Sequence, residues 1–204
     1  MQLTPVIKNL IILNVLMFFG TMLLPAETRL NLALGYFENG EIFRPYQLAT
    51  HFFMHADLSH LLFNMLGLFF FGDKIERYLG PERFLILFFV SAAGALLLHT
   101  GAQYYELHQI IDWPESRMNE VGWRSWGASG GVYGVIAARA YKYGNDVFML
   151  IIPPIPVKVK YLALFYIGIT IFSAFSGRAD GVAHFAHLGG AVFGFLMMKY
   201  YERR

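Results

Sequence analysis

The feature that most constrains this chain is a series of six apolar runs divided by polar segments rich in glycine and proline. About 20 apolar residues cross a bilayer as one helix, because a helix satisfies its own backbone hydrogen bonds in lipid. Several runs are shorter than that. The pattern predicts an all-α, polytopic membrane protein with a six-transmembrane-helix bundle, forming one domain over residues 1–204. The runs are Ile7–Leu24, Leu58–Phe71, Phe84–Thr100, Ala128–Ala140, Tyr161–Phe175 and Val182–Met198.

The composition agrees with a lipid environment. Charged residues make up 15% of the chain, against about 25% in an ordinary soluble domain. The net charge is only +2, and no long basic run indicates nucleic-acid binding. The absence of cysteine excludes disulfides and thiolate metal sites.

The first run also resembles a signal peptide, because Leu24-Pro25-Ala26 follows it. Only Lys8 supplies the basic character such a peptide has at its start, and no clean small-x-small cleavage pattern follows. Since more apolar runs come later, an uncleaved first span is the simpler interpretation.

Lys and Arg indicate the direction of the spans. If the N-terminus is inside, 11 basic residues lie inside and 5 outside, which together are the 16 in the chain. The positive-inside rule therefore predicts that both termini are cytoplasmic. The long loops Pro25–Gln47 and Gly101–Gly127 then lie outside. Their aromatic residues suit a membrane interface; they are Tyr36, Tyr46, Trp113, Trp123 and Trp126.

Four polar residues stand out within the apolar runs: His60, Asn64, Ser129 and His187. Polar groups inside a membrane are costly and usually functional. Counting back from the basic residue that ends each span, at ~1.5 Å per residue, places each one roughly 15–21 Å above the inner boundary. A common depth on three parallel helices predicts one buried site.

Glycines predict that two of these helices approach closely. Gly130 and Gly134 form one Gly-xxx-Gly face, and Gly190 and Gly194 form another. Such faces also occur in plain helix packing. Here one begins directly after Ser129 and the other three residues after a histidine, which favours a site between the helices.

Ser129 and His187 suit nucleophilic catalysis. A serine hydroxyl becomes a nucleophile when a base takes its proton, and neutral histidine is such a base near pH 7. Every Asp and Glu falls in a loop or at a span end, with Asp57 as the expected N-cap of the second span. We therefore predict a Ser–His dyad without a carboxylate. Tyr133, one turn after Ser129, either holds the imidazole by ring packing or is an ordinary packed aromatic.

A tetrahedral intermediate also needs hydrogen-bond donors for its oxygen. The Ser129 amide, at a helix start, is one candidate. His60 and Asn64 share a helix face and are two more, although Asn64 could instead bond helices together. The sequence has no intramembrane aspartate pair and no His-Glu-x-x-His zinc motif.

Taken together, these motifs resemble the rhomboid proteases over nearly the whole chain. The family's Gly-x-Ser-Gly with a later glycine corresponds to Gly127, Ser129, Gly130 and Gly134. Its Ala-His-x-x-Gly-x-x-x-Gly corresponds to Ala186, His187, Gly190 and Gly194. Its His-x-x-x-Asn corresponds to His60 and Asn64.

The resemblance implies an intramembrane serine endopeptidase that cleaves transmembrane proteins near the outer membrane face. Ser129 would be the nucleophile, His187 the base, and Tyr133 its stacking partner. His60, Asn64 and the Ser129 amide would form the oxyanion site. No cofactor and no metal are expected, and the partners are transmembrane substrates and membrane lipids, not nucleic acid. We expect a bacterial inner membrane, and by analogy a gate at the loop Ser176–Gly181 and the fifth span.

Two departures from the family pattern are visible. Many members carry Trp-Arg in the first outer loop, where this chain has Tyr46-Gln47 with Arg44 nearby; this puts the usual loop anchor in doubt. We also expect no soluble N-terminal domain and no seventh span, which is the minimal six-helix form.

Two other functions compete with this interpretation. One is a polytopic metal-ion transporter, with histidines as ligands. The other is a non-catalytic rhomboid-like protein that binds helices. The histidines of the first alternative are His51, His55, His60, His184 and His187.

Overall fold

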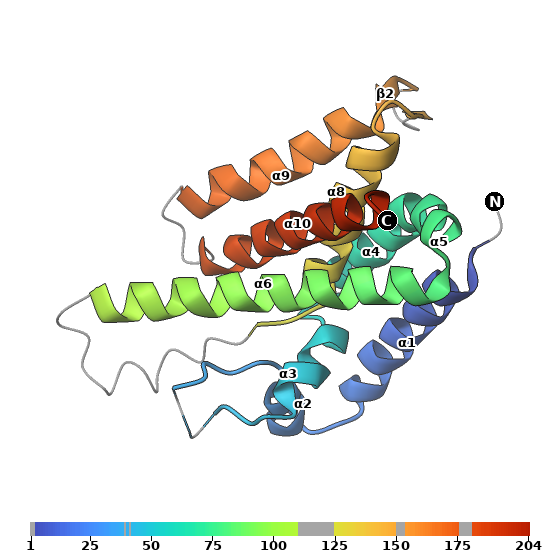
Figure 1. Ribbon diagram of the computed structural model, residues 1–204. Helices are drawn as coiled ribbons and strands as arrows, with labels where there is room; N and C mark the ends of the chain where they lie inside the picture. The colour runs from blue at the N-terminus through green and yellow to red at the C-terminus, as the bar shows by residue number, and fades with distance from the viewer. Residues whose placement is uncertain (1–2, 39, 41, 110–124, 150–153, 176–180) are drawn as a thin grey trace.

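The computed structural model describes residues 3–38, 40, 42–109, 125–149, 154–175 and 181–204 (Figure 1). A helix lies over each of the six predicted runs. The longest, α6, extends well beyond the predicted end at Thr100. These helices are α1 (Pro5–Met22), α4 (Leu58–Gly67), α6 (Pro81–Gln109), α8 (Ser129–Tyr143), α9 (Val159–Phe175) and α10 (Gly181–Glu202).

Two helices in the described part are long and apolar enough to cross a membrane, α1 and the Pro81–Tyr105 portion of α6. A shorter apolar stretch, Val159–Gly168, lies in α9. The mostly helical architecture is therefore confirmed, whereas the number of crossings stays a prediction.

The second run continues beyond α4 through a π-helical turn, η2 (Leu68–Gly72), into α5 (Asp73–Leu79). As predicted, Asp57 caps the start of α4, where its carboxylate accepts the amide N–H of His60. Hydrogen bonds from the Ser59 hydroxyl and the His60 amide hold the pKa of Asp57 below its usual range. This cap fixes the first turn of α4, which carries His60.

A buried carboxylate joins α5 to α1. Both oxygens of Glu76 accept hydrogen bonds, from the amides of Val6 and Ile7 at 3.0 Å each. These amides lie in the first turn of α1 and have no carbonyl of their own helix to bond. Glu76 therefore caps α1 and sets where the N-terminal helix meets the bundle.

The centre of the bundle is the contact among α6, α8 and α10, which Figure 1 shows side by side. The two glycine faces meet directly. A methyl group on Gly190 would lie 2.1 Å from the carbonyl oxygen of Gly130, and one on Gly194 would lie 2.3 Å from Cα of Gly134. Only glycine allows this approach of α8 and α10.

The described part of the connection between α1 and α4, which includes the first long loop, contains three short helices: α2 (Ala26–Leu32), α3 (Gln47–Thr50) and the 3₁₀ helix η1 (His51–Phe53). The sequence left the anchor of this loop in doubt. The structure assigns that task to Gln47, which is fully buried.

All the hydrogen-bonding groups of the Gln47 side chain are used within this loop. Its oxygen accepts the amides of Gly35 at 3.1 Å and Arg44 at 3.0 Å. Its nitrogen donates to the carbonyls of Asn31 at 3.0 Å and Ile42 at 2.9 Å. One side chain thus ties four backbone groups of the loop together.

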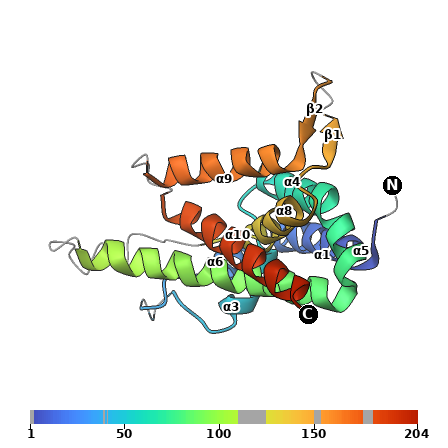
Figure 2. The same cartoon turned by 45° about the horizontal axis from the view of Figure 1, so that its top comes forward.

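A small antiparallel hairpin adds to the mostly helical fold. Strands β1 (Val147–Met149) and β2 (Pro156–Lys158) pair between α8 and α9, and Figure 2 shows the hairpin at the start of α9. Prolines 154 and 156 exclude a helix there, as expected, but extended backbone was not predicted. The expected gate loop at 176–180 and the tryptophans at 113 and 123 lie outside the described residues.

Candidate active site

The turn before α8 positions Ser129 as the first residue of that helix. Gly127 has φ +106°, a backbone conformation that favours glycine. Its amide donates to the carbonyl oxygen of His51 at 2.9 Å. A side chain at 127 would also meet the His60 ring at 2.9 Å. Gly127 is therefore required both for the turn and for the close approach of α4.

Ser129 and His187 are brought together across the contact of α8 and α10. The Ser129 hydroxyl lies 3.0 Å from Nε2 of His187, and Ser129 is buried. Within the described part of the chain, Nδ1 of His187 is buried and has no hydrogen-bond partner. The pair has the hydrogen-bond geometry of a nucleophile and its base, without a carboxylate behind the base.

Tyr133 lies flat against the His187 ring. The ring centroids are 4.3 Å apart and the planes differ by 6°. Tyr133 comes one helical turn after Ser129, so a single face of α8 carries both the hydroxyl and the ring that holds the imidazole. Ring stacking fixes the plane of the imidazole where an Asp would do so in a triad.

His60 and Asn64 approach the same turn from α4. The ideal Cβ position of Gly127 is 2.9 Å from Nε2 of His60 and 3.4 Å from Nδ2 of Asn64. Asn64 is buried, and its Nδ2 has no hydrogen-bond partner among the described residues. An unpaired buried donor costs about 1–3 kcal/mol. Its N–H groups can therefore bond a substrate oxygen beside Ser129.

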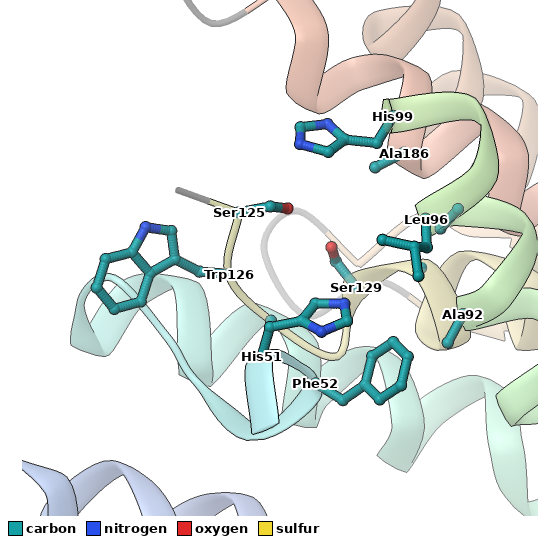
Figure 3. Close-up of a pocket in the computed structure, with 12 residues that line it drawn as sticks. His51, Phe52, Ala92, Leu96, His99, Ser125, Trp126, Ser129 and Ala186 are labelled. Carbon is teal, nitrogen blue, oxygen red and sulfur yellow. The ribbon is translucent and has the colours of Figure 1, made fainter. Parts of the chain in front are cut away.

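A small cavity beside Ser129 is lined in part by His99 and Ser125, which the sequence analysis did not single out (Figure 3). Its volume, about 20 Å³, is enough for about one water molecule. Polar side chains of His51, His99 and Ser125 line it together with Ser129. Nδ1 of His51 bonds the Gln47 carbonyl at 2.6 Å, so it carries the proton and Nε2 is the basic nitrogen of the neutral ring. The sequence carried a signal for His99, because this polar residue lies within the third apolar run, where polar groups are usually functional.

His184 and His55 each lie close to a histidine that the sequence assigned to the site. The His184 and His187 rings are 6.3 Å apart, and the His55 and His60 rings are 5.1 Å apart. The hydroxyl of Ser129 thus bonds His187 and not the neighbouring His184. In the ranges that the structure describes, no group of three His, Asp or Glu side chains could hold a metal ion.

Comparisons with known proteins agree with this geometry. A family model described as "Rhomboid domain" matches residues 43–204. The chain is 33% identical to Rhomboid protease AarA of Providencia stuartii over 148 residues, which are 71% of this chain and 51% of that protein. It is 28% identical to RHOMBOID-like protein 12, mitochondrial, of Arabidopsis thaliana over 193 residues, 91% of this chain and 55% of that protein.

A third relative matches along almost the whole chain. This is Rhomboid protease GlpG of Photorhabdus laumondii, 23% identical over 208 residues, which cover 99% of this chain and 63% of that protein. The chain thus spans about half the length of the first two curated relatives and somewhat more of this one.

Proposed function

Because this chain belongs to the rhomboid family of integral membrane proteins, we propose that it is a serine endopeptidase that cleaves transmembrane protein substrates within the membrane. The observation that carries the proposal is the 3.0 Å contact between the Ser129 hydroxyl and His187 Nε2. Curated relatives described as rhomboid proteases support it. The reaction requires neither a metal nor a cofactor, because the two side chains supply nucleophile and base.

In the first step, Nε2 of His187 accepts the hydroxyl proton as Oγ of Ser129 attacks the carbonyl carbon of the peptide bond. The carbonyl π electrons move to its oxygen, and a tetrahedral intermediate forms. The donors beside Gly127, from His60 and Asn64, stabilise this oxyanion together with the Ser129 amide. His187 then gives the proton to the leaving amine, and the acyl group stays on Ser129.

The second step needs water at a buried serine. The small cavity lined by His51, His99 and Ser125 adjoins Ser129, and we assign it to the water that hydrolyses the acyl group. His187 takes the proton of that water as its oxygen attacks the ester carbon. The proton then returns to Oγ of Ser129 as the bond to the acyl group breaks.

The finer topology belongs to the same proposal. We expect six spans, with both termini cytoplasmic in a bacterial inner membrane, and a single domain over residues 1–204. A substrate helix has to unwind before cleavage, because an intact helix hides its peptide bonds. Cleavage near the outer face follows from the predicted depth of Ser129.

A fluorophosphonate probe tests the assignment directly. We expect covalent labelling of Ser129 in the wild-type protein, and none in His187→Ala, because the hydroxyl is unreactive without its base. The label is located by mass spectrometry of the purified full chain, with His184→Ala as the matched variant that still labels. A wild-type protein that never labels would favour a non-catalytic, helix-binding relative.

Asn64→Ala is expected to lower kcat by up to ~100-fold, with KM nearly unchanged. Its Nδ2 lies at the Gly127 turn and is unpaired in the described part of the chain. A donor aimed at the oxyanion bonds more strongly in the transition state than in the ground state. The expected loss in kcat is at the lower end of the ~100–1,000-fold that removal of one oxyanion donor usually causes, because His60 and the Ser129 amide remain. Turnover is measured on protein of matched thermal stability. An unchanged kcat with lowered stability would make Asn64 a packing residue.

A further inference from the structure

A second, larger hollow lies between α8, α9 and α10, away from the small cavity at Ser129. Its volume is about 550 Å³, within the usual range of ligand pockets. The floor is made of small buried residues, including Ala137, Ala163 and Ala191, and larger side chains such as Leu164 and Leu196 form exposed walls. Alanines on three facing helices leave a groove because they lack the volume to fill it.

One end of the apolar groove meets a hollow that is lined by polar residues. A smaller, polar hollow of about 320 Å³ adjoins this apolar hollow at the end of α8, and the two share Ala140, Tyr141 and Lys160. The smaller hollow is lined by polar groups, among them Asn145 and Asp146. The two hollows therefore meet at Lys160, where the lining of the groove changes from apolar to polar.

The cations that the structure describes at the polar end differ in whether a carboxylate pairs with them. Lys142 is paired with Glu202 at 2.6 Å, and Asp146 is paired with Lys74 at 2.6 Å and Arg139 at 2.7 Å. The Lys160 ammonium has no carboxylate as ion-pair partner among the described residues.

Lys160 instead donates to the neutral Asn145 oxygen at 2.9 Å. Its position is fixed by the backbone, since the Lys160 amide bonds the carbonyl of Gly144 at 3.0 Å and the Val159 amide bonds that of Asp146 at 2.9 Å. The cation is thus held where the apolar part of the groove begins.

We propose that this groove binds one anionic glycerophospholipid, with an acyl chain between α8, α9 and α10 and its phosphate on Lys160. The juxtaposition of a long apolar hollow and a fixed, uncompensated ammonium matches the two ends of such a lipid. A basic residue at the membrane surface attracts anionic lipid headgroups. Figure 1 shows α9 beside α10, and Figure 2 shows the hairpin at the start of α9, so the headgroup lies beside the hairpin.

The dimensions disfavour a substrate helix as the occupant. A helix about 10 Å across fills 550 Å³ within about one to two turns of its length. An acyl chain is much thinner and follows the groove from Lys160 toward Leu188, the residue directly after His187. The lipid would therefore contact the two helices that carry the dyad.

Native mass spectrometry of the purified full chain tests the site. The probes are dioleoylphosphatidylglycerol and dioleoylphosphatidylcholine, titrated separately in detergent. We expect Lys160→Gln to weaken phosphatidylglycerol binding about five-fold and to leave phosphatidylcholine binding unchanged. The matched control is Lys158→Gln, an exposed lysine of β2 two residues earlier that lines neither hollow. Equal phosphatidylglycerol affinity in the two variants would overturn the proposal.

Two further measurements separate the acyl chain from the charge. Ala140→Phe, which fills the junction of the two hollows, should weaken both lipids. Failure to do so in protein of unchanged thermal stability would remove the groove from the site. A photoreactive residue at Leu164 should crosslink to phospholipid in membranes, and an adduct with a transmembrane protein instead would show that the groove binds a helix. Because none of these readouts uses proteolysis, they stand apart from the proposed enzymatic activity.

Discussion

Ser129→Ala and His187→Ala are each expected to lower the cleavage rate by at least ~10⁴-fold, and the double variant should be no slower than either one. The two side chains meet at 3.0 Å and act as one unit, because the hydroxyl is inert without the base and the base has no proton to take without the hydroxyl. Losses within such a unit do not add. This is the largest effect that we expect from any single side chain.

The measurement is cleavage of a transmembrane reporter by each variant in the same lipid or detergent. His184→Ala is the matched control, because the same residue type is removed from the same helix, with its ring 6.3 Å from that of His187. We expect that control to lose far less activity. Substantial cleavage by folded Ser129→Ala protein would refute the mechanism, and a double variant much slower than both singles would show that the residues act separately.

Gly190→Val should reduce the rate by ~100-fold or more through geometry alone. Even a Cβ at this position would lie 2.1 Å from the carbonyl oxygen of Gly130, so the added side chain must push α10 away from α8. Ser129 and His187 sit on these two helices close to the contact. A displacement of ~1 Å between reacting groups can cost ~100-fold in rate.

Gly20→Val is the control for this substitution. Gly20 lies within α1, and no atom lies within 4 Å of its ideal Cβ position. The two variants share the same intrinsic change in helix propensity on replacing glycine by valine, so they differ in the helix contact. For each variant we would measure the cleavage rate, the thermal stability and the extent of fluorophosphonate labelling. Normal turnover in Gly190→Val would show that the glycine contact does not position the dyad.

The sequence alone determined the parts of this protein that depend on local pattern. Hydropathy is a property of each segment, so the six apolar runs located the helices. The cost of polar groups in lipid singled out Ser129, His187, His60 and Asn64 before any contact was known. Small residues at fixed spacing predicted which faces of α8 and α10 would meet. The roles assigned to these residues await the experiments above.

The tertiary structure decided what depends on segments far apart in the chain. Gln47 anchors the loop between α1 and α4 because four backbone groups converge on one amide, and no spacing rule encodes that convergence. His99 faces the Ser129 cavity only because α6 crosses beside α8. The groove at Lys160 exists because three helices each present alanine at one place. Local pattern sets which surfaces are small, polar or apolar, but only the packing of helices determines which of those surfaces meet and what space remains between them.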